Sequence, residues 1–124
     1  MVFKDTMLVL NGILAPWEPK GMKAKDVSLL KKIFRDSSFC RVEENIVRIV
    51  CPTGDTLAII SLNDNRLVVT DFSTLLDDYE RCRCRKVMRW LKKKLSKLEN
   101  LEVKVVKFYG MLYTAEVPLE ALFD

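Results

Sequence analysis

The 124-residue sequence contains no histidine and no glutamine. The absence of histidine removes the side chain that most often acts as general base or metal ligand near neutral pH. Serine or cysteine catalysis of the usual kind is excluded, because it needs an imidazole beside the nucleophile. We therefore expect a non-enzymatic protein with no catalytic residue and no cofactor. The absence of glutamine, with 31% charged residues, favours a thermostable protein from a thermophilic source.

Glycine-rich loops and long apolar runs are also missing. The four glycines are isolated, so no loop of the kind that cradles phosphates is present. The apolar stretch Met7 to Ala15 is interrupted by Asn11-Gly12, is too short to span a membrane and lacks the basic start of a signal peptide. We expect no membrane association and a cytoplasmic protein, or one of the host-cell cytoplasm if its origin is viral rather than archaeal.

The four cysteines do not have the spacing of a structural zinc site. Cys40 and Cys51 are further apart than the two to four residues typical of a ligand pair. Cys82 and Cys84 would point about 200° apart on a helix, so they cannot bind one ion together. We expect buried free thiols, with a Cys40–Cys51 disulfide between strands as the alternative.

The hydrophobic pattern predicts one α+β domain over residues 1–124. Its sheet is mostly antiparallel, with about four to six strands and two helices packed on one face, and a ferredoxin-like variant is an alternative. A helix that begins near Asp71 or Ser73 either breaks near Tyr79 or continues to Leu98. The other predicted elements are a hairpin over 8–15, a helix over 24–34, strands over 46–51 (extended by 39–42), 57–62, 66–70, 101–109 and 111–117, and a docked tail over 118–123.

Acidic residues are absent between Arg81 and Lys97, where nine residues are Lys or Arg. The whole chain has 21 basic and 17 acidic residues, so the positions outside this segment hold 12 basic and 17 acidic residues. A segment of charge +9 is therefore attached to a body of charge −5. A charge density of one sign can recruit an anionic partner.

On a helix, this basic segment has one apolar side. Placed at 100° intervals, its apolar residues form a stripe about 100° wide that we expect to face the sheet. The stripe consists of Cys84, Val87, Met88, Leu91, Leu95 and Leu98. The rest of the circumference is basic, with Trp90 at the edge of the stripe. The candidate site residues are Arg81, Arg83, Arg85, Lys86, Arg89, Trp90, Lys92, Lys93, Lys94 and Lys97.

The leading hypothesis is a small binding module whose basic helix contacts nucleic-acid backbone, with Trp90 stacking on a base. Like charges repel at Arg85/Arg89, Arg89/Lys93 and Lys93/Lys97, which a helix selected only for stability would avoid by mixing signs. The alternative is a solvated face with Trp90 packed at the sheet edge. A protein-binding inhibitor or adaptor of viral or phage type, docking on an acidic or nucleic-acid-binding surface, is a further hypothesis. A homo-oligomer that joins the basic helix to the acidic body is another.

A divalent-metal nuclease is a third hypothesis, because it needs only carboxylates and a lysine. The predicted order of helix, three strands, helix and strand is similar to the core of restriction-endonuclease-like folds. Asp55, in Pro52-Thr53-Gly54-Asp55, and the pair Asp64/Arg66 resemble the paired acidic motif of that group. Here Arg66 replaces the expected lysine, and a permanently protonated guanidinium cannot act as a base. Asp71, Asp77 and Asp78 are alternative cation ligands.

Residues Arg66 to Tyr79, RLVVTDFSTLLDDY, followed by a helix and a strand pair, resemble an uncharacterised family of small prokaryotic and phage domains. The shared pattern is a strand that ends in a Thr-Asp or Ser-Asp step before a short helix containing leucine. The resemblance covers about half of the chain and departs from the family where Phe72-Ser73 stands in place of a glycine. It implies an association with mobile elements or their hosts and no particular activity.

Overall fold

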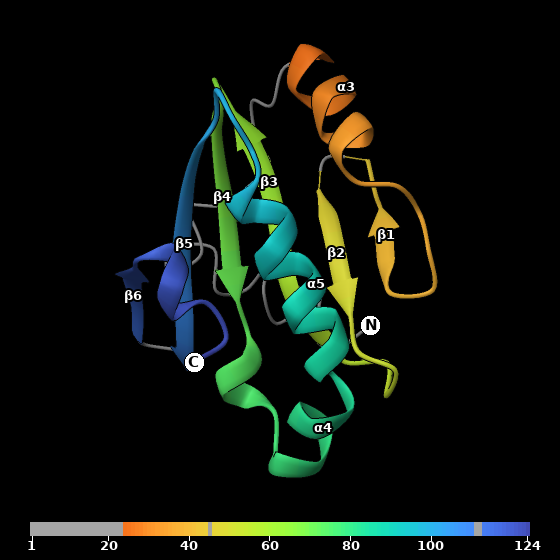
Figure 1. Ribbon diagram of the computed structural model, residues 1–124, viewed down its shortest axis with the longest axis vertical. Helices are drawn as coiled ribbons and strands as arrows, with labels where there is room; N and C mark the ends of the chain where they lie inside the picture. Colours follow the sequence, from red (N-terminus) through yellow and green to blue (C-terminus); the bar gives the residue numbers. More distant parts are fainter. Residues whose placement is uncertain (1–23, 45, 111–112) are drawn as a thin grey trace.

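The computed structural model describes residues 24–44, 46–110 and 113–124, and these build an α+β fold around one six-stranded sheet (Figure 1). Each strand pairs with the next one along the chain. The strands are β1 (Cys40–Val42), β2 (Val47–Val50), β3 (Thr56–Asn63), β4 (Arg66–Asp71), β5 (Glu102–Gly110) and β6 (Tyr113–Val117). The predicted α+β class and mostly antiparallel sheet are confirmed. The predicted hairpin over 8–15 lies outside the described residues.

All strand pairs are antiparallel except β4 and β5, which are parallel. A parallel pair needs a crossover connection, and the basic segment provides most of it. The connection consists of the 3₁₀ turn η2 (Ser73–Leu75), helix α4 (Asp78–Arg83) and helix α5 (Arg85–Ser96). Within the described residues β1 to β4 follow one another without an intervening helix, so the ferredoxin-like alternation of strands and helices is not formed.

Two element boundaries differ from the prediction. The segment 39–42 does not extend the next strand, because β1 turns back and pairs antiparallel with β2. The long helix is divided at Cys84, and its start is capped by Asp77 instead of Asp71 or Ser73. The Asp77 side chain accepts a hydrogen bond from the Glu80 amide at 2.8 Å, and the Glu80 carboxylate accepts one from the Asp77 amide at 3.2 Å. This reciprocal pair is a capping box.

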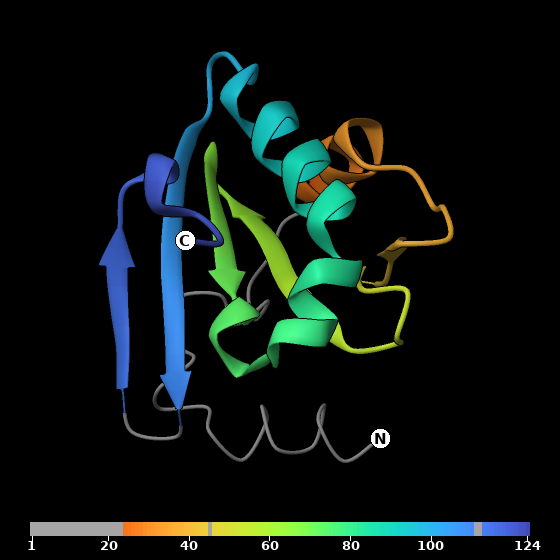
Figure 2. The same cartoon turned by 60° about the horizontal axis from the view of Figure 1, so that its bottom comes forward.

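The main hydrophobic core lies between one face of the sheet and helices α3 (Ala24–Ile33) and α5. Figure 2 shows both helices on the same side of the sheet. The predicted apolar stripe of α5 faces this core: four of its members are buried and two are partly buried. The buried ones are Cys84, Val87, Leu91 and Leu95, and the partly buried ones are Met88 and Leu98. A smaller cluster around Ile59 and Phe108 is buried on the opposite face.

Cys51 and Cys84 form a disulfide, with their Cα atoms 5.3 Å apart. The prediction of free thiols is therefore wrong for these two residues, and so is the alternative Cys40–Cys51 pairing. The bond joins the end of β2 to the junction of α4 and α5. Cys40 and Cys82 are free, the first buried and the second exposed. The pKa of Cys40 is raised to about 11, mainly by burial and also by the nearby Asp36 carboxylate, while Lys94 opposes the rise.

A buried ion pair joins the carboxyl ends of the two parallel strands. Asp71 of β4 is fully buried, and its Oδ2 lies 3.8 Å from Nζ of Lys107 in β5. The same carboxylate accepts hydrogen bonds from the amides of Ser73 at 2.8 Å and Phe123 at 2.9 Å. Lys107 also donates to the backbone oxygen of Asp124. The pair therefore fixes η2 and the chain's last residues, where η3 (Leu119–Ala121) forms the predicted docked tail.

No helix within the described ranges is long and apolar enough to cross a membrane.

We expect the double variant Cys51→Ala/Cys84→Ala to lose about 3–4 kcal/mol of unfolding free energy, since the disulfide closes a loop with a sequence separation of 33 residues. Urea unfolding followed by circular dichroism measures the loss. Cys82→Ser is the matched control and should change stability by less than about 0.5 kcal/mol, because Cys82 is exposed and unpaired. Four titratable thiols in the unreduced, denatured wild type would contradict the disulfide.

We expect Lys107→Ala to destabilise the protein by about 3–5 kcal/mol, because it leaves the buried Asp71 carboxylate without its cation. The double variant Asp71→Asn/Lys107→Ala should lose less than the sum of the two single losses, since the charge that needs compensation is then absent. Urea unfolding at neutral pH measures all three variants. Strictly additive losses would show that the two side chains do not interact.

Candidate nucleic-acid interface

The outer side of helix α5 carries a row of exposed cations. The helix has 12 residues and is therefore about 18 Å long. Leu91 is fully buried, and at 100° per residue the cations lie on the side of the helix opposite to it. We call this row the outer basic face; it consists of Arg85, Lys86, Arg89, Lys93 and, at the C-cap, Lys97. The core contacts of α5 thus hold these five charges toward solvent.

The outer basic face is not compensated by the part of the chain that the structure describes. None of its five residues makes an ion pair or a hydrogen bond through its side chain with a described residue. The five ion pairs found there are Arg48–Glu43, Arg66–Glu102, Lys92–Asp124, Lys104–Glu116 and Lys107–Asp71. Only Lys92 of the basic segment takes part in one. The cations are therefore free to contact an external anion.

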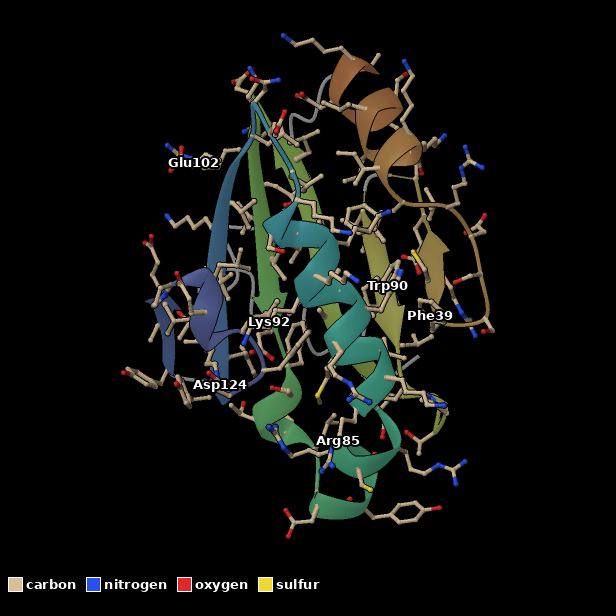
Figure 3. All side chains as sticks on the ribbon, viewed as in Figure 1. Phe39, Arg85, Trp90, Lys92, Glu102 and Asp124 are labelled. Carbon is tan, nitrogen blue, oxygen red and sulfur yellow. A yellow bond between two sulfur atoms is a disulfide. The ribbon has the colours of Figure 1, made fainter. Side chains whose placement is uncertain are left out.

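Three other predicted site residues are engaged in holding the fold together. Arg81 donates to the backbone oxygens of Ser73 and Phe123, both at 2.8 Å. Lys92 donates to the backbone oxygen of Glu120 at 2.7 Å and lies 3.8 Å from Asp124 Oδ1. Figure 3 shows Lys92 and Asp124 close together beside α5. Lys94 lies over the rings of Phe34 and Trp90, at 5.8 and 5.7 Å from their centroids. These three cations therefore stabilise the fold through contacts within the chain, and they are not part of the outer basic face.

Trp90 packs against two aromatic residues that precede the first strand of the sheet. Its ring is half-buried and meets Phe39 edge-on, with centroids 4.8 Å apart and an interplanar angle of 75°. Phe34 makes a second edge contact at 6.4 Å. Figure 3 shows Trp90 and Phe39 together on the β1 side of α5, while Arg85 lies near its first turn. This packing favours the interpretation of Trp90 as a core residue, and we leave it out of the interface.

A groove runs between α5 and the last residues of the chain. It is a cavity of about 260 Å³, lined on the helix side by Arg85, Met88 and Arg89 and on the other by residues 122–124. Arg81 and Lys92 also line it. The groove thus has four cations and one carboxylate, Asp124. The docked tail was predicted from the sequence, but its role as a wall beside Arg85 and Arg89 was not.

A larger cavity of about 580 Å³ lies near the turn between β2 and β3 and is charged differently. Its buried Arg48 makes two hydrogen bonds to the Glu43 carboxylate, at 2.9 and 3.3 Å, and a third to Thr56 at 3.2 Å. Asp55 and Glu80 line the same cavity together with Arg41. Three carboxylates and two guanidinium groups thus line this cavity, so it does not favour an anion as the groove beside α5 does.

The predicted nuclease residues do not come together. Asp55 and Asp64 stand at opposite ends of β3, an eight-residue strand that is about 26 Å long. They cannot bind one ion, so their pairing in the nuclease hypothesis is wrong. Arg66 is paired with Glu102 at 3.2 Å. Among the residues that the structure describes, no group of three or more acidic or cysteine side chains could hold a metal ion.

No family model matches this chain, and neither does any curated protein or solved structure. The resemblance of residues 66–79 to small prokaryotic and phage domains therefore stays a prediction.

We expect Trp90→Ala to cost about 2–3 kcal/mol of stability, less than the 3–5 typical of a fully buried tryptophan, because the ring is half-buried. It should leave nucleic-acid affinity of the folded protein within about twofold of wild type. The matched control on the same helix is Arg89→Ser, for which we expect the reverse: stability within about 0.5 kcal/mol of wild type and weaker binding. Urea unfolding and fluorescence anisotropy measure the two effects. A stable Trp90→Ala variant that binds poorly would return Trp90 to the interface.

Proposed function

We propose that this protein is a non-enzymatic module that binds the backbone of nucleic acid through the outer basic face of α5. The observation that carries the proposal is the set of five exposed cations that no described residue compensates. Because α5 is fixed by Leu91, Leu95 and the Cys51–Cys84 disulfide, these cations keep a constant spacing. Because the helix is already rigid, its backbone needs no ordering when a polyanion binds, and only the side chains lose conformational freedom.

Nucleic acid suits this row better than a small anion does. A duplex carries one phosphate charge per about 1.7 Å, so several phosphates lie within reach of a helix that is about 18 Å long. The Arg and Lys residues can all contact phosphate oxygens, and none of them needs a particular base. We therefore propose binding that depends on the backbone and not on sequence.

Salt dependence tests this proposal. If about five phosphates are neutralised, the logarithm of the association constant should fall with the logarithm of salt concentration with a slope of about −3.5 to −4.5. Fluorescence anisotropy with a labelled oligonucleotide, between about 50 and about 200 mM salt, measures the slope. Arg89→Ser and Lys93→Ser should each weaken binding and reduce the slope by about one.

Arg41→Ser is the control with the same change in net charge. Arg41 is exposed on β1, and its neighbour Cys40 points into the core under α5, so Arg41 points to the opposite face of the sheet. Its loss should leave affinity and slope almost unchanged. No binding at about 50 mM salt, or binding that salt does not weaken, would contradict the proposal. Co-purification with an acidic protein that survives nuclease treatment would instead identify a protein as the partner.

A further inference from the structure

The described part of the chain exposes four large hydrophobic side chains, and three of them are tyrosines. Tyr79, Tyr113, Leu75 and Tyr109 are exposed by 65%, 59%, 48% and 47%. The chain has three tyrosines in all, so every tyrosine is among them. Tyrosines that were needed only for packing would be buried, as the phenylalanines Phe34 and Phe72 are. Exposed apolar side chains that gather at one place on a surface mark a candidate contact site.

All four residues lie at one end of the sheet. Leu75 and Tyr79 follow the carboxyl end of β4, Tyr109 lies at the carboxyl end of β5, and Tyr113 begins β6. The Thr74 hydroxyl donates to the backbone oxygen of Phe108, which ties η2 to that end of β5. In Figures 1 and 2, α4 lies at the end of the sheet toward which the β4 arrow points.

Tyr113 and Tyr109 lie on the face of the sheet that α5 covers. Val117 of β6 packs into the core under α5, and Tyr113, four residues earlier on the strand, points to the same side. The Tyr109 ring is 5.1 Å from that of Tyr113, with an interplanar angle of 37°. Arg83 covers one side of the Tyr79 ring, at 5.9 Å from its centroid. All three rings are thus accessible to solvent, and the Tyr79 ring lies beside a cation.

Arg81 connects this aromatic end to the groove beside α5. Its guanidinium holds both η2, through Ser73, and the last residues of the chain, through Phe123. It also lines the groove that contains Arg85 and Arg89. A ligand chain that lies on the tyrosines can therefore continue over Arg81 onto the outer basic face.

We propose that the bound nucleic acid is single-stranded, with bases stacked on Tyr79 and on the Tyr109–Tyr113 pair and phosphates on Arg85 and Arg89. This inference rests on the proposed function and narrows it. In a duplex the bases stack on one another and cannot reach protein rings, whereas unpaired bases stack on exposed aromatic side chains without sequence preference. The adjoining cations favour a polyanion over an apolar peptide as the occupant.

The test compares a labelled oligothymidine of about 12 nucleotides with a duplex of the same length, at about 50 mM salt. We expect the single strand to bind at least about fivefold more tightly. Tyr79→Ala and Tyr113→Ala should each weaken single-strand binding about fivefold or more, since stacking on one aromatic ring contributes at least that much. Neither should change duplex binding. Tyr79→Phe keeps the ring and should keep the affinity, and thermal unfolding should show all three variants folded, because the side chains are exposed.

Tyrosine ring signals in NMR give a second readout, because the chain has three tyrosines and all belong to the proposed site. Oligothymidine should shift these signals and leave those of Trp90 unchanged. Equal affinity for the two ligands, or tyrosine variants that bind like wild type while Arg89→Ser binds weakly, would overturn this inference and leave the proposed function standing. Binding of neither ligand would overturn both.

Discussion

The fully buried carboxylate of Asp71 is the constraint on which the functional end of this protein depends. It lies where the parallel strands end, and it binds three groups from separate parts of the chain: the Lys107 ammonium and the amides of Ser73 and Phe123. A buried charge is costly unless it is paired and hydrogen-bonded, so these partners are held firmly in place. The crossover through α4 and α5 begins at this point. The carboxylate therefore fixes where the crossover leaves the sheet, and the core contacts of α5 then set the direction of the outer basic face.

Much of the fold could be predicted because local patterns agreed with the final packing. The Asn63–Arg66 turn has positive φ at Asp64 and Asn65, as a tight two-residue hairpin turn requires. The stripe around Leu91 was placed correctly because a long amphipathic helix has only one way to bury its apolar side. The pairing of β1 with β2 was missed, since a three-residue strand is too short to show a period. The Cys51–Cys84 disulfide was missed because the two cysteines come together only after the crossover through α4 and α5 has packed on the sheet.

The candidate site was predicted only in part, for the same reason. Helical geometry alone identifies the five cations opposite Leu91, and none of these five makes an ion pair or a side-chain hydrogen bond with a described residue. It cannot show that Arg81 and Lys92 bind backbone oxygens of the last residues, because those contacts depend on where the tail docks. Trp90 looked available because it sits at the edge of the stripe, yet Phe39 comes from a distant turn and packs against it. The tyrosines are dispersed in the sequence, and only the parallel β4–β5 pair brings them to one end.

The spacing of the outer basic face has a consequence for the unliganded protein. Arg85, Arg89, Lys93 and Lys97 are four residues apart, and each like-charged neighbour pair destabilises a helix by about 0.2–0.5 kcal/mol. Added salt screens this repulsion, so it should make the free protein more stable while it weakens the hold on a polyanion. Helix α5 is then kept under electrostatic stress by its attachment to the core. A bound nucleic acid relieves this repulsion because its phosphates neutralise the cations. The stability of the whole fold therefore depends on whether the outer basic face is occupied.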